Sequence, residues 1–214
     1  FTPVMGRLLL SDAANQAEKA LSVLSQMTNC VLSYVQQPPL NGSKVALWIY
    51  MQSEASLVRV DEHTAIVERN GLRHIYHSML VSPLADTYRE TESQLSDLES
   101  CLERQGLNIA DNCVRTWFFV QNVDVNYSAV VEARKKNFLS HGLTPETHYI
   151  ASTGIAGCHA DKRITSILDA YSIGGLAKGQ MGYLYAADNM NRTIDYGVTF
   201  ERGAAIDYAD LCSS

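Results

Sequence analysis

The sequence has few residues of the kinds that mark fibrous, low-complexity or membrane-spanning chains. Glycine and proline number 13 and 5 among 214 residues, which excludes a collagen-like or disordered composition. No apolar run approaches the roughly 20 residues that a membrane-spanning helix needs, so we expect no membrane partner. The composition is instead 46% hydrophobic and 19% charged, which is typical of a globular chain that buries a sizeable core.

Positive charge is also scarce. Lys and Arg number 17 against 23 Asp and Glu, so the net charge is −6. The overall field therefore repels phosphate backbones, and we expect no nucleic-acid partner. The first ten residues lack the basic and long apolar regions of a signal peptide.

The cysteines are few and scattered. They form no Cys-x-x-Cys pair, and only Cys158 has a neighbouring His, too close for the usual zinc-ligand spacing. An odd number of thiols in apolar segments predicts reduced cysteines in a cytoplasmic protein, with no disulfide framework, no metal and no cofactor. The five are Cys30, Cys101, Cys113, Cys158 and Cys212.

Hydrophobic periodicity predicts helices and strands in a mixed order. Helices are expected at 11–27, 86–105 and 127–141, the last two ended by Gly106 and Gly142. Strands are expected at 30–36, 45–51, 56–60, 63–68, 72–80, 113–120, 148–155 and 163–173. The first two strands flank a turn at 38–42, and the next three form a meander with a hairpin at Asn70-Gly71. We therefore predict an α+β fold, a mixed sheet with helices packed on one face.

The chain also contains a weak internal echo. A helix followed by a strand occurs twice, with Trp48 and Gln52 in the first copy at the same relative places as Trp117 and Gln121 in the second. The echo suggests duplicated half-units, although tryptophan in a buried strand is common.

A helix bearing Gln94, its end at 102–106, a strand at 114–120 and a further helix at 127–139 together resemble the Rid family, also called YjgF or endoribonuclease L-PSP-like. The resemblance covers roughly residues 64–175. Residues 195–206 resemble the opening strands of another such unit. The chain thus resembles the N-terminal part of longer tandem Rid-domain proteins related to chorismatases.

The resemblance implies a chorismate-mutase-like fold, a homotrimer, and clefts between subunits that bind a small-molecule ligand. It divides the chain into 1–55, an N-terminal helix and strands read as a half-unit, 56–180, the Rid-like domain, and 181–214, a linker with the truncated opening strands of a second unit. Residues 189–214 are then expected to form an exposed arm that is disordered or pairs with a neighbour.

Active members of this family hydrolyse enamines or imines formed from amino acids. An Arg in a Pro-Ala-Arg-Ser loop grips the substrate carboxylate, and a Glu near the end of the last strand works through water. Thr147, in the loop 145–149, and Asp169 stand at these positions here. Because neutral Thr cannot form a charge-assisted fork, we expect imine deaminase activity to be absent. Arg115 could supply the missing cation if it faces the cleft beside Trp117 and Phe119, and otherwise it lies at a sheet edge.

The remaining candidates lie on the strand predicted at 148–155. Ser152 and Thr153, followed by Gly154, are expected to present hydroxyls and a backbone amide to a small anion, unless they are ordinary strand and turn residues. Tyr149 and Thr147 complete the predicted substrate-binding set.

Asp169 is the candidate catalytic residue, because a carboxylate on a buried strand needs a partner or a raised pKa. A structural ion pair with Arg163 or Arg115 explains it almost as well. His74 and His77 are predicted on opposite strand faces, so they share no metal.

The charge run Arg134-Lys135-Lys136 is expected to be a solvated helix face without an RNA-binding role. Two functions stay open. The first is an enzyme, a hydrolase or lyase of the Rid/chorismatase type, which binds or converts a small carboxylate-bearing metabolite between subunits. The second is a non-catalytic trimerising or regulatory scaffold. The older family label of translation initiation inhibitor draws no support from an acidic chain.

Overall fold

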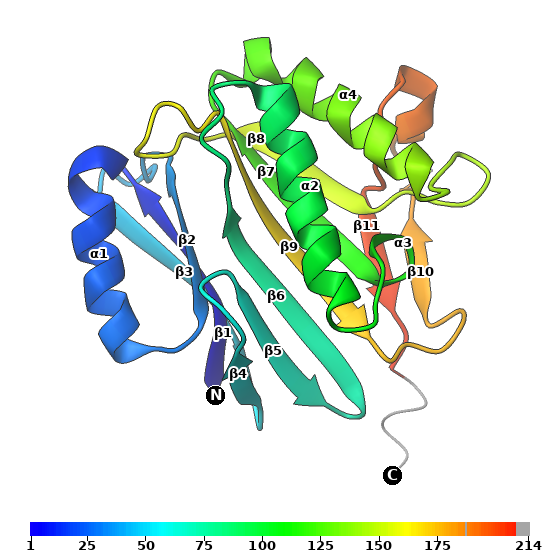
Figure 1. The fold of residues 1–214 in the computed structure, drawn as a ribbon, viewed down its shortest axis with the longest axis horizontal. Helices are drawn as coiled ribbons and strands as arrows, with labels where there is room; N and C mark the ends of the chain where they lie inside the picture. The colour runs from blue at the N-terminus through cyan, green and yellow to red at the C-terminus, as the bar shows by residue number, and fades with distance from the viewer. Residues whose placement is uncertain (187, 209–214) are drawn as a thin grey trace.

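The computed structural model describes residues 1–186 and 188–208, and its architecture is α+β, as predicted (Figure 1). Six strands form a large sheet in the order β4-β5-β6-β9-β7-β8, three form a small sheet in the order β2-β1-β3, and β10 pairs with β11. The strands are β1 (Thr2–Leu10), β2 (Val31–Gln36), β3 (Val45–Gln52), β4 (Ser56–Arg59), β5 (Thr64–Arg69), β6 (Leu72–Leu80), β7 (Cys113–Val120), β8 (Ala151–Ala156), β9 (Ser166–Gly174), β10 (Met181–Leu184) and β11 (Gly203–Ile206). The helices are α1 (Ala13–Met27), α2 (Thr87–Glu103), α3 (Ile109–Asn112) and α4 (Val123–Ser140), with a 3-10 turn, η1, at Thr193–Tyr196.

The large sheet contains the predicted meander. β4, β5 and β6 pair antiparallel in sequence order. Asn70 and Gly71 have φ values of 51° and 75°, as the two-residue turn favoured in hairpins requires. β9 pairs antiparallel with both β6 and β7, whereas β7 and β8 run parallel. The sheet is therefore mixed, as the sequence predicted.

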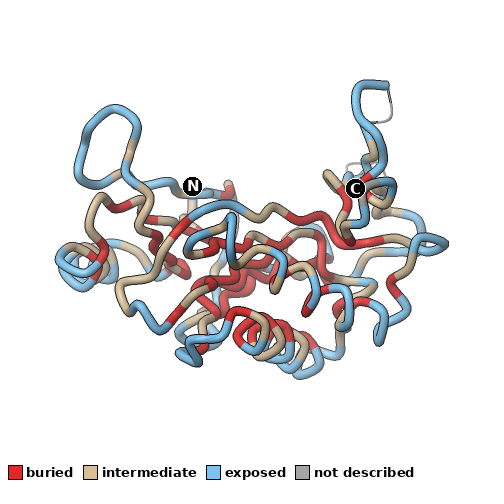
Figure 2. Tube along the Cα trace, turned by 90° about the horizontal axis from the view of Figure 1, so that it is seen from above, coloured by how far each residue is buried: buried red, intermediate tan, exposed pale blue. Residues whose placement is uncertain are grey.

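The helices α2 and α4 pack against each other on one face of the large sheet, and Figure 2 shows the long coils along one side of the sheet layer. Asp86 begins α2, since its side chain accepts a hydrogen bond from the backbone N–H of Arg89. Apolar side chains between helices and sheet form the main core, among them Leu95, Leu98, Phe118, Phe138 and Ile150. We call the side of the large sheet opposite α2 and α4 the open face.

The small sheet differs from the expectation for residues 30–51. Its central strand is β1, which pairs parallel with β2 and antiparallel with β3, so the predicted strands on either side of the 38–42 turn are not paired with each other. β1 was not predicted. Its buried residues include Met5, Leu8 and Leu10, and this apolar content is all that marks it locally, because both of its partners lie further along the chain.

A buried ion pair joins the two sheets. Asp169 of β9 is fully buried, and its Oδ2 accepts hydrogen bonds from the Arg7 guanidinium at 2.5 and 3.0 Å and from the Ser33 hydroxyl at 2.8 Å. Its Oδ1 accepts from the backbone N–H of Met79 at 2.8 Å. That amide is placed by an irregularity in β6, where Met79 has a φ of 61°. Both carboxylate oxygens are thus hydrogen-bonded.

The C-terminal segment is not an exposed arm over the residues described. β11 pairs with β10, and Glu201 bridges to β8, accepting from the Ser152 amide and donating its own amide to the Ile150 carbonyl. Thr193, Thr199 and Glu201 are buried. The expectation is therefore wrong for residues 189–208, because this segment finds partners on β8 and β10, and residues 209–214 lie outside the described part.

The sequence predicted reduced cysteines and no membrane-spanning helix. The four described cysteines are free, and burial raises the pKa of the Cys113 thiol to about 12. Cys212 lies outside the described residues. None of the helices in residues 1–186 and 188–208 has the length and apolar character needed to cross a membrane.

His74 and His77 point to opposite faces of β6, as the sequence predicted. His74 contacts Tyr171 on the open face at 2.7 Å, and His77 contacts Thr64 at 3.3 Å on the other. Burial lowers the pKa of His77 to about 4. Its Nε2 has no hydrogen-bond partner among the described residues.

Removing the Arg7 charge should strongly destabilise the protein. Arg7→Met leaves Asp169 as an uncompensated buried charge, which costs about 3–5 kcal/mol. Urea unfolding measures this loss. Arg163→Met is the control, because Arg163 pairs with Asp161 at the surface and its loss should change the midpoint little. Equal midpoints for Arg7→Met and the wild type would contradict the structural role of the pair.

The free energy of unfolding should fall as the pH drops from about 6.5 toward 4. In this range His77 binds a proton in the unfolded chain but stays neutral in the folded chain. The full effect approaches about 3 kcal/mol. It is absent above the unfolded pKa and grows as pH falls through the window. Urea unfolding at pH 7 and pH 4.5 measures it, and His77→Leu should show a smaller acid loss. An identical pH dependence in that variant would contradict the assignment.

Candidate functional site

The environment of Asp169 is that of a structural carboxylate. The expected partners are wrong: Arg163 binds Asp161 at 2.6 Å, and Arg115 contacts Thr153. The partner is Arg7, which the sequence analysis did not single out because it lies on the unpredicted β1. Asp169 is fully buried and both its oxygens accept hydrogen bonds, and the catalytic role predicted for it stays a prediction.

Arg115 and Thr153 lie together on the open face. A nitrogen of the Arg115 guanidinium donates to the Thr153 hydroxyl at 2.5 Å, and the other donates to the Arg202 carbonyl at 3.4 Å. Trp117 shares this face, with the Arg115 guanidinium 5.4 Å from its ring centroid. The prediction that Arg115 and Trp117 share a side is confirmed.

The sheet register places the predicted residues relative to one another. Trp117 pairs with Thr153 on β8 and with Asp169 on β9, so Thr153 and Asp169 share the open face two strand spacings apart, about 10 Å. Ser152 points the other way, because neighbouring strand residues alternate. The structure therefore brings Thr153 and Arg115 together but separates Ser152 from both.

Ser152 faces α4, where it contacts a buried arginine. Its hydroxyl accepts from Thr116 at 2.9 Å and from Arg134 at 3.1 Å. Arg134 is completely buried, so the expected solvated face is wrong for this residue. Burial lowers its pKa. The sequence run of three basic residues does not indicate that Arg134 is buried, because Lys135 and Lys136 on the same helix are exposed.

The other predicted ligands occupy separate surroundings. Gly154 lies inside β8 and forms no turn, and a Cβ there would come within 2.2 Å of the Tyr127 ring, so glycine allows that ring to approach the strand. Tyr149 is buried and stacks on Phe138 with 6.4 Å between ring centroids. Thr147 is exposed, and its hydroxyl donates to the Gly142 carbonyl at 2.9 Å within its own loop.

An aromatic pocket of about 310 Å³ lies further along the open face. His74 and Tyr171 stack with 6.1 Å between ring centroids and an angle of 7° between ring planes. Arg69 also lines the pocket, and within the described part of the chain no carboxylate lies within ion-pair distance of it. No sequence prediction included this pocket, because its residues come from β3, β5, β6, β9, the hairpin turn after β5 and the C-terminal segment at Tyr208.

The described residues contain no group of three or more His, Cys, Asp or Glu side chains that could hold a metal ion.

Both tryptophans of the sequence echo, Trp48 and Trp117, lie over the Arg7 guanidinium. The distances from its Cζ to the ring centroids are 5.6 Å for Trp48 and 5.5 Å for Trp117, and Phe119 lies at 4.6 Å.

No family model and no curated protein matches the sequence. Several solved structures are similar to part of the chain. The YjgF gene product from E. coli is 19% identical, with 48% of this chain and 81% of that chain covered and a TM-score of 0.41. Rv2704 from Mycobacterium tuberculosis, a member of the YjgF/YER057c/UK114 family, is 17% identical, with 50% and 82% covered and a TM-score of 0.40. E. coli TdcF with bound serine is 14% identical, with 51% and 86% covered and a TM-score of 0.42.

Proposed function

We propose that this chain is a Rid-like protein that binds a small carboxylate-bearing metabolite on the open face, with Arg115 as the carboxylate-binding cation. The observation that carries the proposal is the half-buried Arg115 without a counter-ion. Among residues 1–186 and 188–208, no carboxylate lies within ion-pair distance of it. Its partners are a neutral hydroxyl and a carbonyl.

The physical argument rests on desolvation. Burial lowers the pKa of Arg115, which means that the protein removes water from the cation without supplying an anion in return. A ligand carboxylate would compensate for this loss by accepting two parallel N–H bonds. Thr153 offers a hydroxyl beside it, and the Trp117 ring offers an apolar wall. These three groups fit a small organic acid better than an inorganic anion.

We propose binding without conversion. Catalysis by Asp169 would require it to release Arg7, Ser33 or the Met79 amide, and each release would strand a buried polar group. Thr147 lies in a separate exposed loop, so it supports no imine deaminase reaction. The hydrogen bonds that Asp169 already accepts also favour the non-catalytic alternative, a trimerising or regulatory scaffold.

The homotrimer and the cytoplasmic location stay proposals. The open face carries half-buried Arg115, Trp117 and Tyr171, and a neighbouring subunit would complete a cleft over them. The free cysteines support a reducing compartment.

Arg115→Met should weaken the binding of small carboxylates. A charge-assisted hydrogen-bonded pair contributes about 1.5–3 kcal/mol, so we expect affinity to fall by about 10- to 100-fold. Calorimetric titration with a panel of 2-oxo acids, chorismate and aromatic acids such as benzoate measures it. Arg69→Met, which removes the cation of the aromatic pocket, is the matched control and should bind normally.

Two outcomes would count against this site. If Arg69→Met loses binding and Arg115→Met keeps it, the carboxylate binds in the aromatic pocket. If no acid in the panel binds the wild type, the scaffold alternative is the better account.

The solution mass tests the cleft between subunits. Light scattering during size exclusion should give three times the chain mass of 23.7 kDa. A monomer would remove the cleft and leave Arg115, Trp117 and Tyr171 half-buried at the surface. Trp117→Lys, which places a second positive charge beside Arg115 on this face, should shift a trimer toward monomers.

A further inference from the structure

A second cavity lies between α1 and the end of β6, on the opposite side of the small sheet from Arg7. Its volume is about 650 Å³, within the usual range for small-molecule sites. Leu21, Leu32, Met79 and Val81 give it an apolar wall. Tyr34 of β2 and His159 line it as well, and nothing in the proposed carboxylate site involves either residue.

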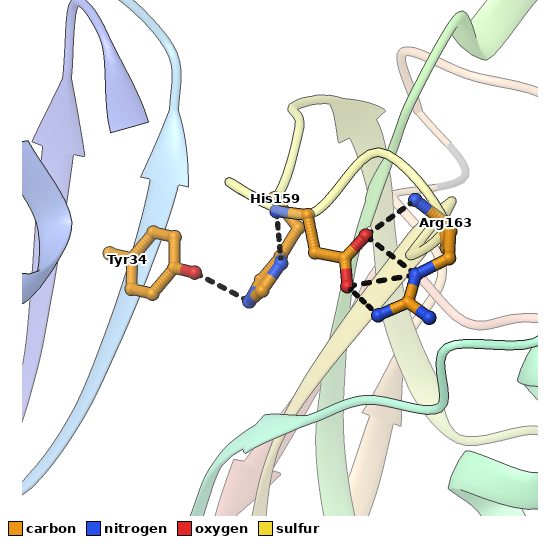
Figure 3. Close-up of polar contacts among 4 residues, drawn as sticks. Tyr34, His159 and Arg163 are labelled. Atoms are coloured by element: carbon orange, nitrogen blue, oxygen red, sulfur yellow. Dashed lines mark hydrogen bonds and ion pairs between the residues drawn. The ribbon is translucent and has the colours of Figure 1, made fainter. Parts of the chain in front are cut away.

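The protonation of the His159 ring is fixed by its neighbours (Figure 3). The backbone N–H of Asp161 donates to His159 Nδ1 at 2.9 Å, so Nδ1 carries a lone pair and the proton of the neutral ring resides on Nε2. Nε2 lies 2.5 Å from the Tyr34 hydroxyl oxygen. Arg163 holds the Asp161 carboxylate at 2.6 Å, which fixes the backbone that makes the first bond.

The consequence is an uncommitted hydroxyl proton on Tyr34. The ring stays neutral, since burial lowers the pKa of His159 and a proton on Nδ1 would face the Asp161 N–H. Nε2–H therefore donates to the Tyr34 oxygen. The hydrogen bond with the Ala160 backbone lowers the pKa of Tyr34, as a bond donated to the phenol oxygen does. In the described part of the chain, Tyr34 oxygen accepts but its hydrogen meets no acceptor. The hydrogen is available to a ligand in the cavity.

The charged groups around the cavity disfavour an anion. The Arg59 guanidinium donates to the backbone carbonyls of Cys30, Asp61 and Glu62 at 2.7, 2.8 and 2.5 Å, so its donors are largely committed. Glu62 and Glu18 add negative charge at the edge. An uncharged guest avoids both the repulsion and the cost of stripping water from an ion.

We propose that this cavity binds a small uncharged, mainly apolar molecule bearing a carbonyl oxygen, which accepts a hydrogen bond from the Tyr34 hydroxyl. His159 is a positioning residue. Its Nε2–H occupies the Tyr34 oxygen as a donor, so the Tyr34 hydroxyl cannot donate to His159 and can donate to the ligand instead. The site differs from the carboxylate site in face, charge and ligand class, so either proposal can fail without the other.

Acetophenone and benzoate are matched probes, with the same ring and either a ketone or a carboxylate. NMR of the methionine methyl groups reports binding, because Met79 lines the cavity. Acetophenone should shift the Met79 signal saturably, and benzoate should not. Tyr34→Phe keeps the buried ring but removes the hydroxyl, and should weaken acetophenone binding about tenfold. Tyr88→Phe, on α2 and remote from the cavity, should leave it unchanged.

Three results would overturn the proposal: no Met79 shift with acetophenone, wild-type affinity in Tyr34→Phe, or benzoate bound in the cavity as tightly as acetophenone. If Tyr34→Phe loses its dispersed methyl spectrum, His159→Gln replaces it. That variant should weaken acetophenone binding by freeing the Tyr34 hydroxyl to turn elsewhere, and undiminished affinity in it would overturn the proposal equally.

Discussion

The ion pair between Arg7 and Asp169 is the constraint on which the arrangement of the two sheets depends. Two buried charges are expensive, and the attraction between them compensates only when the remaining hydrogen-bonding capacity is also used. Here Ser33 and the Met79 amide fill the other positions on the carboxylate. The irregularity in β6 positions this amide, so it helps to hold the two sheets together.

The ion pair between Arg7 and Asp169 also shows how Arg7 differs from Arg115. Arg7 has a buried counter-ion and three aromatic rings around its guanidinium, so it is fully employed in the fold. Arg115, on β7 of the large sheet, has only neutral partners. The difference separates a cation that stabilises the structure from one that a ligand can use. The proposed function therefore assigns ligand binding to Arg115 and a structural role to Asp169.

Local signals in the sequence predicted much of the large sheet. Cys113–Val120 has the predicted bounds, Asp86 caps α2, and Asn70-Gly71 forms the hairpin turn, because each depends on neighbouring residues. β1 escaped prediction because its partners lie further along the chain. Of the candidate site, Arg115 beside Trp117 could be predicted from strand alternation. The Arg7 partner and the buried Arg134 could not, since both depend on contacts between distant segments.

A double-mutant cycle between Arg7 and Asp169 tests most directly whether the Asp169 carboxylate serves the fold. The free energy of unfolding is measured in urea for the wild type, Arg7→Met, Asp169→Asn and the double variant. We predict a coupling energy of about 2 kcal/mol or more, as for contacting residues in one buried network. A coupling energy near zero would contradict the account and return Asp169 to the list of catalytic candidates.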